Sequence, residues 1–121
     1  MDIWAANIMD HYRHPRNTGQ IKSPDFKADG ANTSCGDLIS VSLSLENERI
    51  SKIRFISQGC AISQAAMSIL SDALIGHSIN EVGAYGLDFV EKNIGIKVSD
   101  RRQNCALLGL RTIQKAISNK I

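Results

Sequence analysis

Hydrophobic and polar residues alternate in a stretch near the middle of the chain. Residues 39–45 place an apolar side chain at every second position, with serines between them, and a period of two predicts a strand with one buried face. Asn47 and Glu48 predict a turn, after which residues 50–58 return as a second strand. The two strands therefore form an antiparallel hairpin. A weaker signal over Phe26–Asn32 predicts one further strand before it.

After Cys60 the hydrophobic period changes from two to that of a helix. Ile62, Ala66, Ile69 and Leu70 fall on one stripe, and Gly76 predicts its end. Further helices are predicted over residues 2–13, 79–84, 86–93 and 101–118, the last with Ser99 or Asp100 as its N-cap. Because strands come first and helices gather afterwards, the predicted class is α+β, a small three-stranded antiparallel sheet with helices packed on one face.

Composition narrows the class of protein. The 121 residues suffice for one domain spanning 1–121 with a buried core, and 43% hydrophobic with 21% charged residues is typical of a folded chain. A net charge of +2 argues against a nucleic-acid partner. No apolar run reaches the roughly 18 residues that span a bilayer, which argues against a membrane protein. The residues from Met1 to Trp4 lack the pattern of a signal peptide, so a cytoplasmic location is expected.

The three cysteines are the candidate chemical groups. An odd number of thiols in a reducing compartment does not predict a disulfide framework. Cys35 precedes a strand beside Gly36, Cys60 follows Gly59 where a strand gives way to a helix, and Cys105 lies near the start of the last helix. Helix N-termini favour the thiolate, the form that binds metal or attacks sulfur. Cysteines that only fill the core need no such positions, so the positions favour a chemical role. The spacing alone does not show that the three cysteines share one site.

Four short motifs carry a family resemblance over nearly the whole chain. They are His11-Tyr12-Arg13-His14-Pro15-Arg16-Asn17, Cys35-Gly36-Asp37, Gly59-Cys60-Ala61-Ile62-Ser63 and Cys105-Ala106-Leu107-Leu108. Each is weak by itself, but the four occur in the order found in one family. The chain resembles the U-type iron–sulfur cluster assembly scaffolds, a family that includes IscU, SufU and the N-terminal domain of NifU.

The resemblance implies a SufE/NifU-like fold and a function. A cysteine desulfurase would supply sulfur, and a transient 2Fe–2S cluster would form before transfer to acceptor apo-proteins, which makes the chain a carrier rather than an enzyme. The implied ligands are Cys35, Asp37, Cys60 and Cys105. Thiolates are the usual ligands of such clusters, whereas the harder carboxylate oxygen of Asp37 binds iron less strongly and eases release. Read from its sequence alone, Asp37 could instead be a turn residue of its own loop.

Departures from the family leave alternatives open. Asn104 stands where IscU-type scaffolds carry a histidine, and residues 98–102 lack the Leu-Pro-Pro-Val-Lys motif, so a dedicated Hsp70 chaperone is not predicted. Around Cys105 the chain is more similar to SufU, although the SufU insertion before that cysteine is absent. A second interpretation is thus a zinc-dependent sulfur carrier, in which Cys105 leaves the metal to accept sulfur. A third, a purely structural zinc site, fits Asp37 poorly because such sites favour Cys and His.

The histidines and the tryptophan are weaker candidates. His11 is expected to pack or cap within the first helix, and His77 to be exposed in a polar turn. Trp4 suits a homodimer or partner contact as well as it suits the core, so the oligomeric state stays open.

Overall fold

The sheet is the base on which the helices pack. A computed structural model describes residues 3–33 and 36–118, so Cys35 and the side chain of Trp4 lie outside the described part of the chain. Strands β1 (Phe26–Asn32), β2 (Asp37–Glu46) and β3 (Arg49–Gln58) form an antiparallel sheet in the order β1-β2-β3. Asn47 and Glu48 connect β2 to β3 with φ of 54° and 63°, the left-handed conformation of a tight hairpin turn. All three predicted strands are confirmed.

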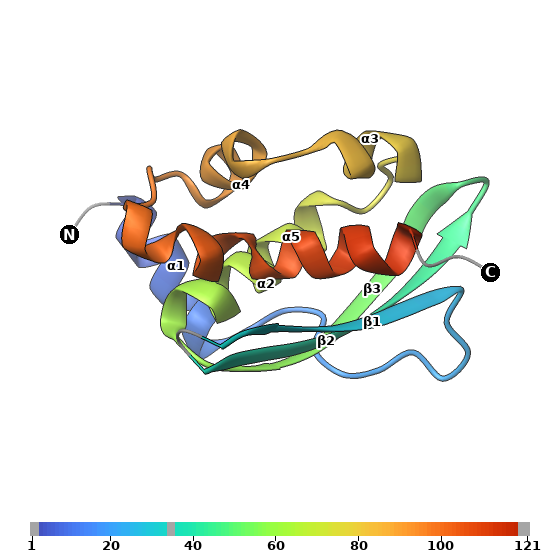
Figure 1. Cartoon of the computed structure of the whole chain (residues 1–121), viewed down its shortest axis with the longest axis horizontal. Helices are drawn as coiled ribbons and strands as arrows, with labels where there is room; N and C mark the ends of the chain where they lie inside the picture. Colours follow the sequence, from blue (N-terminus) through green and yellow to red (C-terminus); the bar gives the residue numbers. More distant parts are fainter. Residues whose placement is uncertain (1–2, 34–35, 119–121) are drawn as a thin grey trace.

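The helices form two layers above one face of the sheet. They are α1 (Ile3–Arg13), α2 (Ala61–Ala73), α3 (Ile79–Ala84), α4 (Leu87–Ile94) and α5 (Gln103–Ser118). Figure 1 shows α2 and α5 next to the sheet and α3 and α4 beyond them. The predicted class is therefore confirmed. No helix among the described residues is both long and apolar enough to cross a membrane.

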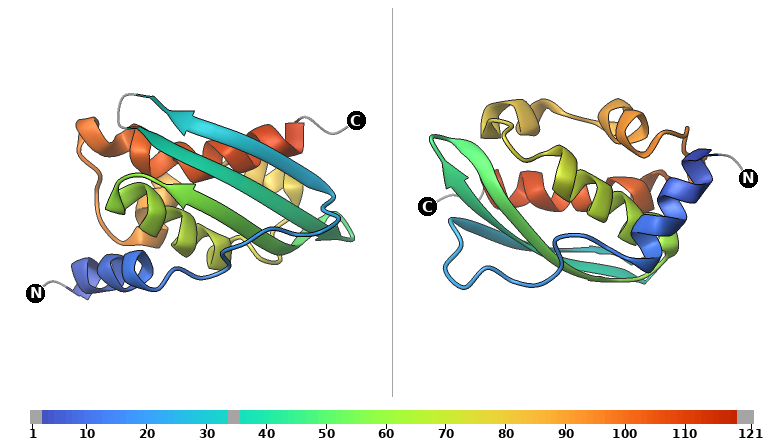
Figure 2. Two further views of the ribbon diagram at one scale, coloured as in Figure 1. Left: turned by 90° about the horizontal axis from the view of Figure 1, so that it is seen from below. Right: turned by 180° about the vertical axis from the view of Figure 1, so that it is seen from behind.

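On the opposite face of the sheet the described residues form no helix, and the segment that links α1 to β1 crosses it (Figure 2). Asn17 and Gly19 in this segment hydrogen-bond to the backbone of Phe55 on β3. Farther along, the N–H of Ile21 donates to Ser42 Oγ at 3.0 Å. This cover explains why Ser42 is buried although it belongs to the polar face of β2.

The core lies between the inner face of the sheet and the helices α2 and α5. Leu43 on β2, Leu70 on α2 and Leu110 on α5 each have no exposed surface. A Cβ added to Gly109 on α5 would lie 2.6 Å from the sulfur of Met67 on α2. The glycine therefore permits close packing of the two helices whose first residues border the candidate site.

Two expectations differ from the structure. A short 3₁₀ turn (Asp100–Arg102) precedes α5, which begins at Gln103 rather than at residue 101, and the Ser99 side chain makes no capping hydrogen bond. The tighter turn satisfies the backbone in another way, because the N–H of Arg102 donates to the carbonyl of Ser99.

His77 is half-buried rather than exposed, and its Nδ1 is 2.7 Å from the Tyr85 hydroxyl oxygen.

The N-terminal motif, residues 11–17, makes polar contacts with α2. His11 is buried, and its Nδ1 lies 2.7 Å from Ser68 Oγ on α2. The same Ser68 oxygen accepts the backbone N–H of Arg16 at 2.9 Å, and Asn17 Nδ2 donates to Ser71 Oγ at 2.8 Å. The expectation that His11 packs within the fold is confirmed, and it has no part in the candidate site described below.

His11 makes the stability depend on pH. Burial, and next the nearby positive charge of Arg16, lower the pKa of His11 below its ordinary value of 6.5, against the opposing charges of Asp72 and Asp10. The unfolded chain therefore takes up the proton first as the pH falls. We expect the free energy of unfolding to be undiminished above pH 6.5 and to decrease below it.

Urea unfolding at pH 7.5 and 5.5 tests this expectation. His11→Gln should lower stability at pH 7.5 by about 1 kcal/mol through the lost Ser68 contact, and should flatten the decrease toward pH 5.5. The same change at exposed His14 should keep the wild-type pH profile. An equal decrease in wild type and His11→Gln would show that another group is responsible.

Candidate metal centre

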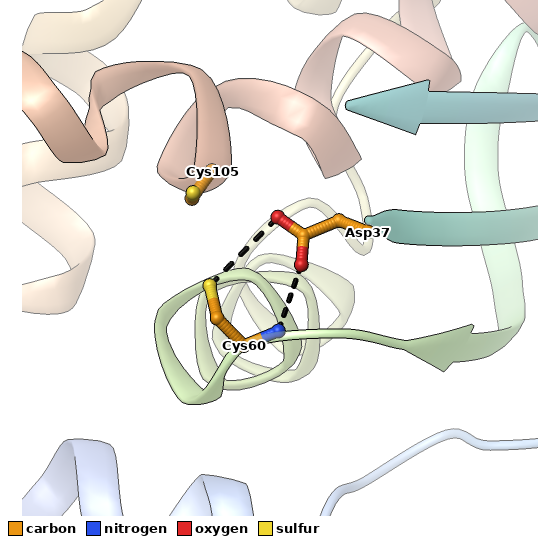
Figure 3. A group of neighbouring side chains, drawn as sticks. All are labelled: Asp37, Cys60 and Cys105. Carbon is orange, nitrogen blue, oxygen red and sulfur yellow. Dashed lines mark hydrogen bonds between the residues drawn. The ribbon is translucent and has the colours of Figure 1, made fainter. Parts of the chain in front are cut away.

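Asp37 is the deepest polar group of the candidate site. It is the first residue of β2 and has no exposed surface. The pleat of β2 turns the side chains of Asp37, Ile39 and Val41 toward the helices, and all three are buried. Asp37 Oδ1 accepts the backbone N–H of Cys60 at 2.7 Å, and Oδ2 lies 3.8 Å from Cys60 Sγ (Figure 3). The carboxylate thus faces the start of α2.

Gly59 makes this contact sterically possible. Its φ is 143°, and an added Cβ would lie 2.0 Å from Asp37 Oδ1 and 2.9 Å from Asp37 Cα. A glycine has no Cβ, so its backbone can approach a neighbouring group closely. At Gly59 the group approached is the carboxylate of Asp37.

Cys60 occupies the N-cap position of α2, as the change of period predicted. Its backbone is extended, with φ of −72° and ψ of 162°, and its carbonyl accepts from the N–H of Gln64. The side chain of Gln64 donates to the carbonyl of Gly59 at 2.8 Å, which fixes the junction from the other side. Cys60 is half-buried, so its sulfur is the more accessible of the two described thiols.

Cys105 reaches the same place from α5. It is the third residue of that helix and is 1% exposed. Asn32 Nδ2, at the end of β1, donates a hydrogen bond to Cys105 Sγ with an N···S distance of 3.5 Å. Figure 3 shows the three side chains of Asp37, Cys60 and Cys105 around a common space, and one ligand atom from each lies within 4.8 Å of the others.

The chemistry of these groups suits a cation. A carboxylate with no exposed surface requires compensation of its charge. Within the described ranges, the ion pairs are Arg16–Asp10 and Arg49–Glu81, and neither involves Asp37. Two thiol groups and one carboxylate on three separate elements can instead converge on a thiophilic metal or on cluster iron. The donor set therefore fits such a group.

The structure describes three of the four ligands predicted from the sequence. The fold brings Asp37, Cys60 and Cys105 together, whereas Cys35 lies outside the described residues, two positions before Asp37 in the chain. None of the three histidines belongs to the described group. Asn32 was missed, because neither its residue type nor its place at the end of a weak strand signal distinguishes it in the sequence.

Replacement of Gly59 tests the close approach. Gly59→Ala should force Asp37 away from the N–H of Cys60, lower the stability by about 1–3 kcal/mol, and weaken zinc binding measured by chelator competition. Gly76→Ala is a matched control, since Gly76 also has a positive φ, of 88°, but an added Cβ would meet nothing within 4 Å. We expect the control to lose stability from backbone strain while it keeps its zinc affinity. Equal zinc affinity in both variants would contradict the assigned role of Gly59.

Comparisons of sequence and fold find similar proteins of known family. The IscU 1 iron–sulfur cluster assembly scaffold protein of Archaeoglobus fulgidus is 28% identical over 115 residues, which cover 95% of this chain and 74% of that protein. The zinc-dependent sulfurtransferase SufU of Bacillus subtilis is 26% identical over 135 residues, covering 98% and 91%. The fold matches the crystal structure of the N-terminal part of a NifU-like protein from Brucella abortus, with a TM-score of 0.79, 20% identity, and coverage of 93% and 90%.

A family match covers almost the entire chain. Residues 3–120 match the NifU-like N-terminal domain, and this range includes all four motifs described above together with the group formed by Asp37, Cys60 and Cys105. The resemblance that the sequence motifs indicated is therefore confirmed, and the chain belongs to the NifU-like N-terminal domain family.

Proposed function

We propose that this protein is a scaffold on which a 2Fe–2S cluster is assembled and from which the cluster passes to acceptor proteins. The observation that carries the proposal is the convergence of Asp37, Cys60 and Cys105, with ligand atoms within 4.8 Å of one another. Cys35, two positions before Asp37 in the chain, supplies the fourth ligand in this proposal. Relatives that carry the name of iron–sulfur cluster assembly scaffold support it.

The proposed ligand set suits a cluster that has to be released. Thiolates hold cluster iron firmly, whereas a carboxylate oxygen is a harder and weaker ligand for it. In this protein the weaker ligand is also tied to the backbone, because Asp37 Oδ1 accepts the N–H of Cys60. Displacement of Asp37 by a ligand of the acceptor would open the cluster at one iron, while the three cysteines still hold it.

The partners follow from the same chemistry. Sulfur would arrive as the persulfide of a cysteine desulfurase, and apo-proteins with unoccupied cluster sites would receive the product. Cys60 is the more exposed of the two described thiols. It is therefore the described ligand that a partner protein reaches first.

A zinc-dependent sulfurtransferase is the second candidate function. It is favoured by the similarity to the SufU protein over 91% of that protein's length, and by a set of sulfur and oxygen donors that also suits tetrahedral zinc. In this mechanism a released cysteine thiolate attacks the outer sulfur of the desulfurase persulfide. The persulfide bond breaks, the desulfurase thiolate leaves, and the acceptor cysteine carries the sulfur without net oxidation. Cys105, expected from sequence to be that acceptor, is 1% exposed and would have to move outward first.

Anaerobic reconstitution with iron and sulfide separates the two functions. A scaffold should develop the visible absorption of a 2Fe–2S cluster, with two irons per cluster, and Cys35→Ser, Cys60→Ser and Cys105→Ser should each reduce it strongly. Each variant removes a thiolate, which is the usual ligand of such clusters. Tightly bound zinc with no cluster, together with zinc-dependent sulfur acceptance, would identify the sulfurtransferase. Neither metal bound would contradict both functions.

Asp37→Ala tests the role of the oxygen ligand. We expect a longer-lived cluster and slower transfer to an apo-acceptor, measured by the decay of visible absorption with and without the acceptor. The variant should also lose about 1–3 kcal/mol of stability, since the part-buried N–H of Cys60 loses its partner. Cluster lifetimes equal to that of wild type would show that Asp37 does not control release.

A further inference from the structure

One cross-strand pair joins the end of β1 to the start of β2. Asn32, the last residue of β1, is paired with Asp37, the first residue of β2. Side chains of directly paired residues project from the same face of a sheet, and here that face is the one covered by the helices. An amide donor and a carboxylate acceptor therefore stand side by side at this end of the sheet.

The two side chains of this pair contact different cysteines. Asp37 accepts from the N–H of Cys60 and approaches its sulfur. Asn32 Nδ2 donates to Cys105 Sγ at 3.5 Å, within the usual range for a hydrogen bond to sulfur. The pair thus connects the sheet to the first turns of both α2 and α5.

We propose that Asn32 is a positioning residue for the bound metal or cluster. Its side chain holds Cys105 Sγ by an N–H···S hydrogen bond and reduces the electron density on that sulfur. The inference rests on the proposed function, since it assigns Cys105 as a ligand. It concerns a residue that binds no metal itself and acts only through the sulfur.

The charge of the proposed ligand set explains why such a donor is useful. Three thiolates and one carboxylate carry more negative charge than a divalent ion neutralises. A neutral amide disperses charge from one sulfur without adding a cation that would hold the product electrostatically. Hydrogen bonds to ligand sulfurs tune both metal affinity and reduction potential.

The position of Asn32 allows its side chain to be changed with little disturbance of the core. Asn32 is half-buried and lines an open cavity of about 410 Å³ between the end of β1 and α5. Replacement by alanine would enlarge this cavity and give water access toward Cys105 Sγ. The neighbouring Asn104 lines the same cavity but is exposed, and its Oδ1 accepts from Arg111 Nη1 at 3.0 Å.

Zinc and cobalt binding test the proposal without a complete cluster. Asn32→Ala should weaken zinc binding by about 10- to 100-fold, as for other residues that orient a metal ligand, measured by competition with a chelator. In the cobalt-loaded protein its thiolate-to-cobalt absorption band should move to longer wavelength, because the sulfur becomes more electron-rich. Asn32→Asp, which is nearly isosteric, should weaken zinc binding further since it places an acceptor against the thiolate. Asn104→Ala, the matched control, should retain wild-type affinity and spectrum.

The outcomes distinguish this inference from the proposed function. Zinc affinity within twofold of wild type and an unshifted cobalt band in Asn32→Ala would overturn the role of Asn32. A loss of affinity with an unshifted band would also overturn it, because it would reveal a purely structural effect. If Asn32→Ala did not fold, the same two readouts on Asn32→Asp would decide. Wild-type cobalt spectra in Cys105→Ser would instead contradict the proposed metal site itself.

Discussion

The arrangement of the site depends on the buried carboxylate of Asp37. A carboxylate without exposed surface is costly unless hydrogen bonds and positive charge compensate it. The N–H of Cys60 supplies one hydrogen bond, and Gly59 leaves the space that this bond requires. A bound metal or cluster iron would supply the positive charge. The same interaction therefore ties the beginning of β2 to the beginning of α2 and leaves the site suited to a cation.

The rest of the fold brings the ligands to this point. Packing of Gly109 against Met67 holds α5 close to α2, so that Cys105 near the start of one helix faces Cys60 at the start of the other (Figure 3). The polar contact of His11 with Ser68 attaches α1 to the outer side of α2. The architecture thus concentrates the chemistry at one end of the molecule, where two helices begin and a strand pair ends.

Much of this was predictable from local patterns. The alternation in β2 and the change of period at Cys60 gave the strands and α2 because each pattern reflects one buried face. The start of α5 was misplaced because a 3₁₀ turn leaves no distinct signal in its sequence. The proximity of Asp37, Cys60 and Cys105 did not follow from their spacing, and only the family resemblance suggested it. The contact of Asn32 with Cys105 depends on strand register and helix packing together, neither of which a single sequence specifies.

X-ray absorption spectroscopy of the zinc-loaded protein tests the central claim most directly, since it counts the atoms bound to the metal. The account predicts three sulfur ligands at about 2.3 Å and one oxygen at about 2.0–2.2 Å, with the oxygen replaced or lost in Asp37→Ala. Two or fewer sulfur ligands, or nitrogen ligands from histidine, would contradict the assignment of Cys35, Asp37, Cys60 and Cys105 to one metal centre.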